Sequence, residues 1–209
     1  MLRLWTFLLL LVAVLAAVFF FFWDEESGRL AVIMPPPPEI GDVLDSHRDV
    51  PVHYNGKSYK KSHASRYSKD GYYYGKSWQC VEYVKRFYFD AKGHRMPNVW
   101  GHARDFFNPD VPHGALNPDR GLVQFDNGGT TCPAVDDLVV FRGGAFGHVA
   151  IISAVGDDYV EMVQQNVGTK TRDRWKLKRS KGKFHILAKH PPASRLAGVW
   201  LGCEIAPSA

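Results

Sequence analysis

The sequence has few of the residues that hold metal ions. It contains only three cysteines, Cys80, Cys132 and Cys203, and no two of them stand in a CxxC pair. Nine histidines are scattered along the chain, and none belongs to an HExxH pattern. Such spacings are the usual marks of zinc sites, so we expect no metal and no other cofactor.

Length and charge also limit the number of domains and the classes of function that the chain can have. The 209 residues are 45% hydrophobic and 13% aromatic, which suffices for one compact domain with a core but not for two. The net charge is only +5, and the excess is local, because Lys170–Lys183 holds eight Lys or Arg residues and one Asp. Trp175 and Leu177 alternate with basic residues there, which predicts a strand with one basic, solvated face. This face could simply discourage edge pairing, or it could attract an anionic polymer or membrane phosphates.

Charged residues are absent from Leu4–Trp23, and this absence predicts a membrane anchor. The run of 20 apolar or uncharged residues is long enough to cross a hydrocarbon core of about 30 Å. Arg3 before the run and acidic residues after it predict a cytoplasmic N-terminus, with the rest of the chain outside. A cleaved signal peptide is the alternative, but its apolar region is shorter and ends in small residues rather than in FFFFW. We therefore expect residues 1–23 to be an uncleaved signal anchor.

The remaining chain divides into a linker and a domain. Residues 24–50 include PPPP and predict a stiff, extended spacer, so the domain spans residues 51–209. We expect a second helix over Val99–Phe107, capped by Asn98, and a long loop region over Asp110–Pro133. From Asp136 onward the pattern is short strands with turns. Helices followed by an antiparallel sheet indicate an α+β fold.

The stretch SWQCVEYVKRFYFDA, Ser77–Ala91, predicts a helix. Its apolar residues recur at spacings of three and four, Ser77 is a candidate N-cap, and Gly93 is a suitable C-terminal stop. Cys80 falls in the first turn, where unpaired N–H groups and the macrodipole favour a thiolate, so we expect its pKa to be lowered. A thiolate would be a nucleophile. The alternative is a small, buried, hydrophobic cysteine.

A second stretch, Asp136–Gln165, supplies a candidate base. It consists of three short apolar runs separated by GG and GDD turns, and His148 opens the second run directly after Gly147. Nucleophilic cysteine chemistry needs a base within hydrogen-bond reach, and the two residues usually come from distant parts of the chain.

WQCVEYVKRF, GHVAII and VQQNV together resemble the CHAP domain (cysteine, histidine-dependent amidohydrolase/peptidase) and, within it, the amidase half of bacterial glutathionylspermidine synthetase/amidase. The resemblance covers about Pro51 to Gly202. It implies a papain-like α+β domain, with N-terminal helices that carry the nucleophile packed on an antiparallel sheet, which cleaves amide bonds through a thioester. By motif, Cys80 would be the nucleophile and His148 the base. The third member in the amidase is a glutamate just before Gln-Asn, and this chain departs from it with Gln164.

The turn after the strand of His148 decides which residues can orient it. A three-residue turn, Gly156–Asp158, places these residues on the face of His148: Val160, Met162, Gln164 and Asn166. A two-residue turn places Glu161, Val163 and Gln165 there instead. We prefer the first, because it buries Val160 and Met162, and Gln164 would then orient His148 as a neutral acceptor. Asn166 and Glu161 are the substitutes.

Other residues could complete the site. The backbone N–H of Cys80 is a natural donor to an oxyanion, and Gln79 could add a side-chain or positioning contact or be a solvated first-turn residue. Trp78 could line the substrate groove or belong to the core. An extracytoplasmic domain would also permit a disulfide between Cys132 and Cys203.

These observations favour a membrane-anchored cysteine amidase or peptidase. We expect a single-pass protein of the bacterial cytoplasmic membrane with its domain on the periplasmic or extracytoplasmic side. That location makes peptidoglycan peptides the substrate that we rank first and argues against nucleic acid, whereas the amidase motif favours the alternative, a glutathione-polyamine conjugate. A catalytically inactive CHAP-fold binding module is the alternative of a different class.

Overall fold

The computed structural model describes residues 11–15, 36–187 and 199–205, the last stretch by its backbone alone. The chain divides into two units, Met1–Pro37 and Pro38–Ala209. In the first unit residues 11–15 are helical, and the rest of the predicted anchor lies outside the described residues. No helix within the described ranges has the length and apolar character needed to cross a bilayer. The anchor therefore stays a prediction from the sequence.

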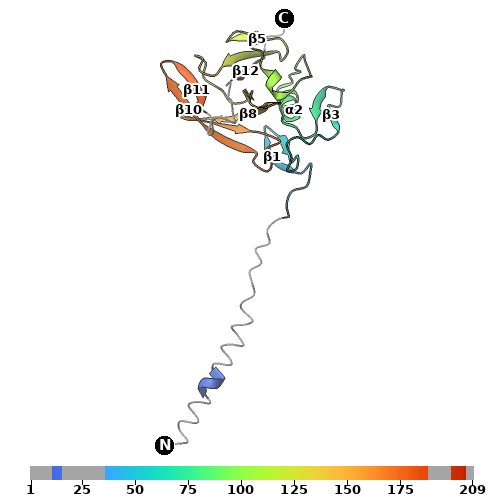
Figure 1. Ribbon diagram of the computed structural model, residues 1–209, viewed down its shortest axis with the longest axis vertical. Coiled ribbons are helices and arrows are strands. Elements are labelled where there is room, and N and C mark those ends of the chain that lie inside the picture. The colour runs from blue at the N-terminus through green and yellow to red at the C-terminus, as the bar shows by residue number, and fades with distance from the viewer. Residues whose placement is uncertain (1–10, 16–35, 188–198, 206–209) are drawn as a thin grey trace, which may run out of the picture. The chain divides into compact units, whose positions relative to one another are not determined.

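The second unit combines helix and antiparallel sheet (Figure 1). Its described helices are α2 (Cys80–Lys92) and a short 3-10 helix, η1 (Ala103–Phe106). The strands are β1 (Val43–His47), β2 (Val50–His53), β3 (Ser65–Tyr67), β4 (Tyr73–Lys76), β5 (Ala115–Asn117), β6 (Leu122–Asp126), β7 (Leu138–Phe141), β8 (His148–Val155), β9 (Tyr159–Val163), β10 (Arg172–Ser180), β11 (Lys183–Leu187) and β12 (Val199–Ile205). The predicted α+β class is confirmed, although the strands outnumber what the sequence pattern indicated.

Eight strands form one sheet in the order β11-β10-β9-β8-β7-β12-β6-β5, and β1–β2 and β3–β4 form separate hairpins. The large sheet curls. The N–H of Gly128 donates to the carbonyl of Phe184 at 2.7 Å, and the N–H of Phe184 donates to the carbonyl of Gly129 at 2.9 Å. These bonds join the residues after β6 to the edge strand β11, so the sheet curves back on itself.

Strand alternation gives the sheet two buried faces. On β8, Val149 and Ile151 pack with Tyr83, Val84 and Phe87 of α2, which are all fully buried. The intervening residues of β8 pack inside the curl with a second apolar cluster: Phe125, Val139, Phe141, Ala150, Ile152, Val160, Met162, Leu177 and Ile186. Burial of apolar surface stabilises the fold by about 25 cal/mol per Å². The sheet therefore separates a layer that holds α2 from a core inside the curl.

Helix α2 begins later than the sequence predicted. Its N-cap is Gln79 and not Ser77, and no side chain caps it. Ser77 lies in a turn after β4, where its N–H donates to the carbonyl of Ala64 and its carbonyl accepts from the N–H of His63. The predicted stop is confirmed, since Gly93 has φ 62° and its N–H donates to the carbonyl of Phe89 at 3.0 Å.

The predicted helix over Val99–Phe107 was wrong, because only η1 forms there. Arg120 explains the difference. Its guanidinium donates to the carbonyls of Asn98 at 2.7 Å and Trp100 at 3.3 Å, which a helix would have needed for its own ladder. Trp100 is 70% exposed instead of lying on a buried face.

Two stretches predicted to lack structure contain strands. The loop region Asp110–Pro133 holds β5 and β6, and β6 pairs with β12, whose residues come far later in the chain. The predicted linker holds β1, which belongs to the compact second unit. Asp136, whose side chain is 2% exposed, accepts hydrogen bonds from His47 at 2.9 Å and Arg48 at 2.7 Å, so it ties this hairpin to the core.

Helix α2 also buries charge. Lys85 is fully buried; its Nζ donates to the carbonyl of Val99 at 2.9 Å and lies 4.8 Å from the ring centre of Tyr73. Burial lowers the pKa of Lys85 to about 7, and the nearby Arg120 acts in the same direction.

Candidate active site

Cys80 is the first residue of α2, and the packing of this helix on β8 fixes its sulfur. The side chain is 7% exposed. Cys80 packs in the buried cluster that also holds Val149, and the backbone N–H groups of Val149, Val81 and Cys80 favour the thiolate form of the sulfur. Because Val149 directly follows His148, the candidate nucleophile lies beside the first residues of β8.

His148 opens β8 after Gly147, a residue with φ 71°. His148 is partly exposed as a whole residue, and the centre of its ring lies 5.6 Å from that of Phe141. Nε2 of His148 is 3.0 Å from Oε1 of Gln164. The amide of Gln164 is oriented in turn, because its Nε2 donates to the carbonyl of Lys170 at 3.3 Å.

This hydrogen bond determines the tautomer of the imidazole. The carbonyl oxygen of an amide can only accept, so Nε2 of His148 must carry the proton. Nδ1 then holds a lone pair and is the nitrogen able to take a proton. Gln164 thus does for His148 what an asparagine does in Cys-His-Asn proteases.

The register that brings His148 and Gln164 to one face arises differently from the prediction. The turn has two residues, since the N–H of Gly156 bonds to the carbonyl of Tyr159 at 2.9 Å, so the predicted three-residue turn was wrong. A β-bulge between Ile152 and Ala154 adds one residue to β8 and corrects the register. Ile151 then pairs with Val163, as the longer turn would have required.

In the part of the chain that the structure describes, no hydrogen bond joins Sγ of Cys80 to the ring of His148. Hydrogen bonds of this kind are often long in ligand-free sites and shorten when substrate binds.

The pKa of the Cys80 thiol differs from the sequence-based prediction. Burial raises the pKa of the Cys80 thiol to about 11, although the N–H groups around the sulfur favour the thiolate. Burial likewise lowers the pKa of His148 to about 4, against the effect of the Gln164 hydrogen bond. The prediction of a lowered cysteine pKa was therefore wrong, because desolvation outweighs the helix terminus. At neutral pH both groups are uncharged.

Gln79 is tied to a neighbouring loop. Its Nε2 donates to the carbonyl of Lys61 at 2.6 Å, and its Oε1 accepts from Asn166 at 2.7 Å. Asn166 also donates to the carbonyl of Tyr59 at 2.9 Å. The side chain of Gln79 is thus engaged in positioning contacts, which leaves the N–H of Cys80 as the simpler oxyanion donor. Trp78, partly buried, stacks on His53 with ring centres 3.9 Å apart.

The two substitutes for Gln164 contact other groups. Asn166 accepts from Asn55 at 2.6 Å in addition to its bonds with Gln79 and Tyr59. Glu161 accepts from Ser153 at 3.1 Å and pairs with Arg172 and Arg174.

Sequence reasoning gave no role to Gln165. This residue is 1% exposed and contacts the first turn of α2. Its place in VQQN offered a signal, because neighbouring strand residues point to opposite faces, so Gln165 faces α2 when Gln164 faces His148.

The possible disulfide between Cys132 and Cys203 does not form, because Cys132 is a free cysteine. Its loop is held toward β11 by Asn127, whose side chain accepts from the N–H of Ile186 at 2.7 Å and donates to its carbonyl at 3.0 Å. Cys203 belongs to β12, which lies between β6 and β7 in the sheet.

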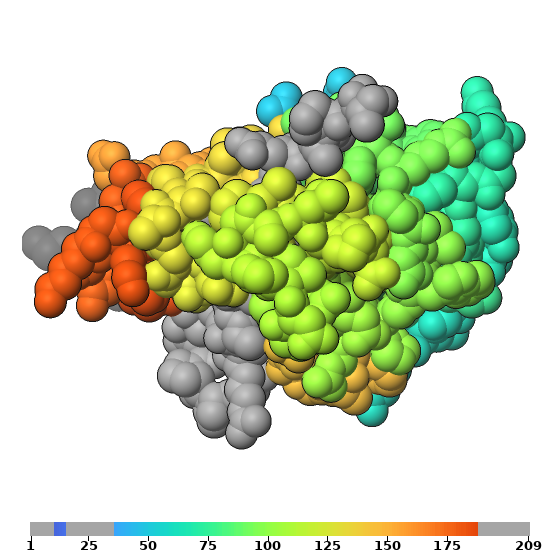
Figure 2. Space-filling model, turned by 90° about the horizontal axis from the view of Figure 1, so that it is seen from above, coloured from blue at the N-terminus to red at the C-terminus, as the bar shows by residue number. Residues whose placement is uncertain are grey.

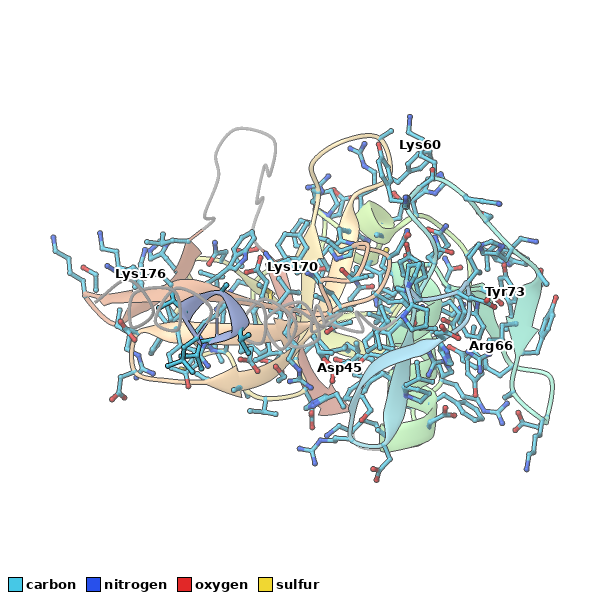
Figure 3. All side chains as sticks on the ribbon, turned by 90° about the horizontal axis from the view of Figure 1, so that it is seen from below. Asp45, Lys60, Arg66, Tyr73, Lys170 and Lys176 are labelled. Carbon is cyan, nitrogen blue, oxygen red and sulfur yellow. The ribbon has the colours of Figure 1, made fainter. Side chains whose placement is uncertain are left out.

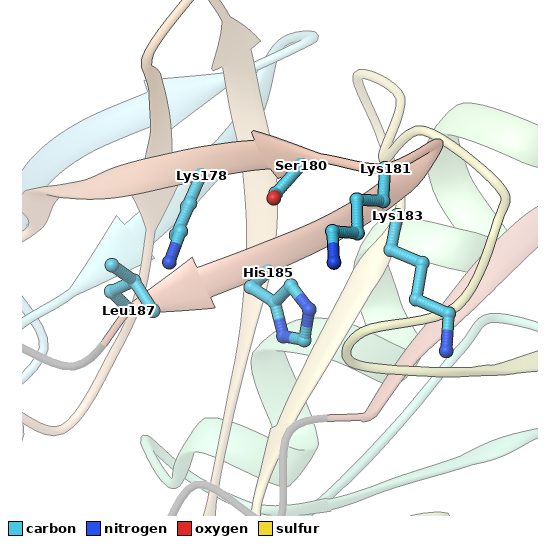
Figure 4. Close-up of a pocket in the computed structure, with 6 residues that line it drawn as sticks. All are labelled: Lys178, Ser180, Lys181, Lys183, His185 and Leu187. Atoms are coloured by element: carbon cyan, nitrogen blue, oxygen red, sulfur yellow. The ribbon is translucent and has the colours of Figure 1, made fainter.

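The basic segment forms the hairpin β10–β11, which projects at one end of the folded unit (Figure 2), with Lys176 far from Arg66 and Tyr73 (Figure 3). A hollow of about 340 Å³ lies on this hairpin (Figure 4). Its lining consists of Lys178, Ser180, Lys181, Lys183, His185 and Leu187. None of the residues discussed at Cys80 and His148 lines it, so it is separate from the candidate active site.

The structure thus places Cys80 at the start of α2 and His148 at the start of β8, with the side chain of Gln164 bonded to the ring. Residues 68–166, a little under half of the chain, match the model of the CHAP domain family. The resemblance inferred from the motifs is confirmed. The match supports an amidase or peptidase type of hydrolase at the level of the family.

The chain is similar to three known enzymes of glutathione-polyamine chemistry. Trypanothione synthetase of Crithidia fasciculata is 30% identical over 123 residues, which is 56% of this chain and 19% of that protein. Bifunctional glutathionylspermidine synthetase/amidase of Escherichia coli (strain K12) is 35% identical over 103 residues, or 47% and 16%. Glutathionylspermidine synthase of Crithidia fasciculata is 36% identical over 104 residues, or 45% and 14%. The match therefore spans less than one fifth of each relative.

Proposed function

We propose that the protein is a cysteine amidase in which Cys80 is the nucleophile, His148 the general base and Gln164 the residue that orients the base. The single observation that carries the proposal is the position of a buried sulfur beside the start of β8, next to an imidazole whose Nε2 bonds to Gln164 at 3.0 Å. The match to the CHAP family supports the same roles.

The reaction begins from an uncharged pair. As Sγ attacks the amide carbonyl, Nδ1 of His148 accepts the thiol proton, so that no buried thiolate has to form beforehand. The N–H of Cys80 stabilises the developing oxyanion. The tetrahedral intermediate collapses when imidazolium gives its proton to the departing amine and leaves a thioester. Water, deprotonated by the same imidazole, then hydrolyses the thioester and frees Sγ.

The names of the similar enzymes favour a glutathione-polyamine conjugate as substrate. The apolar run Leu4–Trp23 favours a second candidate, the peptides of peptidoglycan, because it predicts a membrane anchor with the domain outside the bacterial cytoplasmic membrane. In both cases the scissile bond joins a peptide carbonyl to an amine.

Incubation of the purified full chain with glutathionylspermidine and, separately, with isolated peptidoglycan tests the proposal. We expect release of free amine from one of them. Cys80→Ala should reduce the rate by about a thousandfold or more, because removal of a nucleophile abolishes covalent catalysis. Cys132→Ala is the matched control and should keep wild-type activity. Hydrolysis that survives in Cys80→Ala would contradict the assignment.

A non-catalytic binding module is the second candidate, favoured by the absence of a carboxylate beside His148 and by the raised pKa of the Cys80 thiol. Calorimetry separates it from the amidase. Saturable binding of the conjugate with no amine released by the wild-type chain would support the module.

A further inference from the structure

We propose that Gln165 is a positioning residue that holds the first turn of α2, and with it Cys80, at a fixed place relative to His148. The inference rests on the proposed function and adds a residue to it. Gln165 directly follows Gln164, is 1% exposed and lies two residues after Val163, the last residue of β9.

Both ends of the Gln165 amide are used. Nε2 donates to the backbone carbonyl of Gln79 at 3.0 Å and to Oε2 of Glu82 at 2.8 Å. Oε1 accepts from the backbone N–H of His53 at 2.7 Å. The two donor bonds reach residues on either side of Cys80 in the sequence, so Gln165 clamps the turn that carries the sulfur.

The partner of this clamp is itself immobilised. Glu82 is fully buried, and its Oε1 accepts from Arg86 at 2.7 Å and from Arg66 at 3.2 Å. A bond from an amide to a buried carboxylate is stronger than one between neutral groups. Gln165 therefore binds α2 through a rigid group and not through a mobile surface side chain.

Adjacent strand residues point to opposite faces, which explains how one short segment can serve both reacting groups. Gln164 reaches His148 on one side of the sheet, and Gln165 reaches α2 on the other. A single peptide unit thus connects the orientation of the base to the position of the nucleophile.

The test compares Gln165→Met with Gln124→Met. Gln124 is a matched control: it is fully buried, and its amide donates to the carbonyls of Asn108 at 2.8 Å and Val111 at 3.1 Å, away from the candidate site. Each substitution removes a buried hydrogen-bonded amide and should lower the melting temperature. If Gln165 had a purely structural role, this loss of stability would be the only effect of its substitution.

The decisive measurement is the rate at which iodoacetamide alkylates Cys80 in the full chain. Mass spectrometry monitors the alkylation, and the rate is determined as a function of pH. With the imidazole as general base, the wild-type rate should reach a plateau above about pH 5. Gln165→Met should lower the plateau about ten- to hundredfold, because small displacements of reacting groups cost that much. Gln124→Met should stay within about twofold of wild type.

Equal plateaus for Gln165→Met and wild type would overturn the positioning role while leaving the amidase proposal intact. A wild-type chain whose rate rises tenfold per pH unit without a plateau, and which hydrolyses neither substrate, would instead defeat the proposed function. Should Gln165→Met fail to fold, Gln165→Asn takes its place. It keeps a polar amide but is one methylene too short to reach Gln79, and the same reduction is expected.

Discussion

Oε1 of Gln164 lies 3.0 Å from Nε2 of His148, at the position where the resemblance to the amidase motif implies a glutamate. A neutral acceptor fixes which nitrogen carries the proton but adds no negative charge to stabilise imidazolium. The low pKa of His148, about 4, follows from burial without a compensating charge. The Cys80 thiol and the His148 ring are therefore both uncharged at neutral pH.

Replacement of Gln164 by glutamate should raise the pKa of His148, because a carboxylate stabilises the protonated ring. The acid limb of the hydrolysis rate should then move to higher pH. Gln164→Ala should lower kcat by roughly fivefold, since the lost hydrogen bond is worth about 1 kcal/mol. Rates measured from pH 3 to 8 check both outcomes. An acid limb that does not move in Gln164→Glu would contradict a contact between the side chain at position 164 and the ring of His148.

The wild-type rate should depend little on pH across the neutral range. On the acid side, activity is lost as the pH falls through about 4, because His148 becomes protonated and can no longer accept the thiol proton. On the alkaline side no change is expected until the pH approaches about 11, where the Cys80 thiol ionises. A profile with its acid limb between pH 6 and 8 would indicate a preformed ion pair instead.

Gly147→Ala should displace His148. Gly147 has φ 71°, and a Cβ there would lie 2.5 Å from the carbonyl oxygen of Phe141 and 2.7 Å from the backbone nitrogen of Arg104. Backbone atoms cannot yield cheaply, so we expect a loss of about 1–3 kcal/mol in the free energy of unfolding and a large fall in kcat.

Gly144→Ala is the control for this change. Gly144 has φ 72°, but a Cβ there meets no atom within 4 Å. It therefore carries the strain of positive φ without the collision. Denaturant unfolding and kcat should both be affected less than in Gly147→Ala, and equal effects would show that the collision is unimportant.

Lys85 should make stability depend on pH. Its pKa is about 7 in the folded chain against an ordinary 10.5, so between pH 7 and 9 the unfolded chain binds more protons than the folded one. The free energy of unfolding should rise over this interval, and Lys85→Met should remove that part of the rise. Lys176 is exposed, so Lys176→Met is the control. Urea titrations at several pH values should give it the same rise in the free energy of unfolding with pH as the wild type.

Several features could be predicted because they depend on residues close together in the chain. The apolar periodicity located α2 to within a few residues, and Gly93 marked its end through its tolerance of positive φ. Alternation along β9 allowed Gln164 to reach His148. The start of α2 was misplaced because the bonds of Ser77 with Ala64 and His63 are not local.

The sequence by itself determined the fold class, the family and the order of the candidate residues, since helix periodicity, strand alternation and motif chemistry are written in neighbouring positions. Only the tertiary structure decided the rest. Arg120 takes the carbonyls that a helix after Asn98 would need, and β12 arrives from the far end of the chain to pair with β6. Burial by surrounding elements raises the pKa of Cys80, and a bulge in β8 sets the face of His148, because solvation and register depend on packing and not on local pattern.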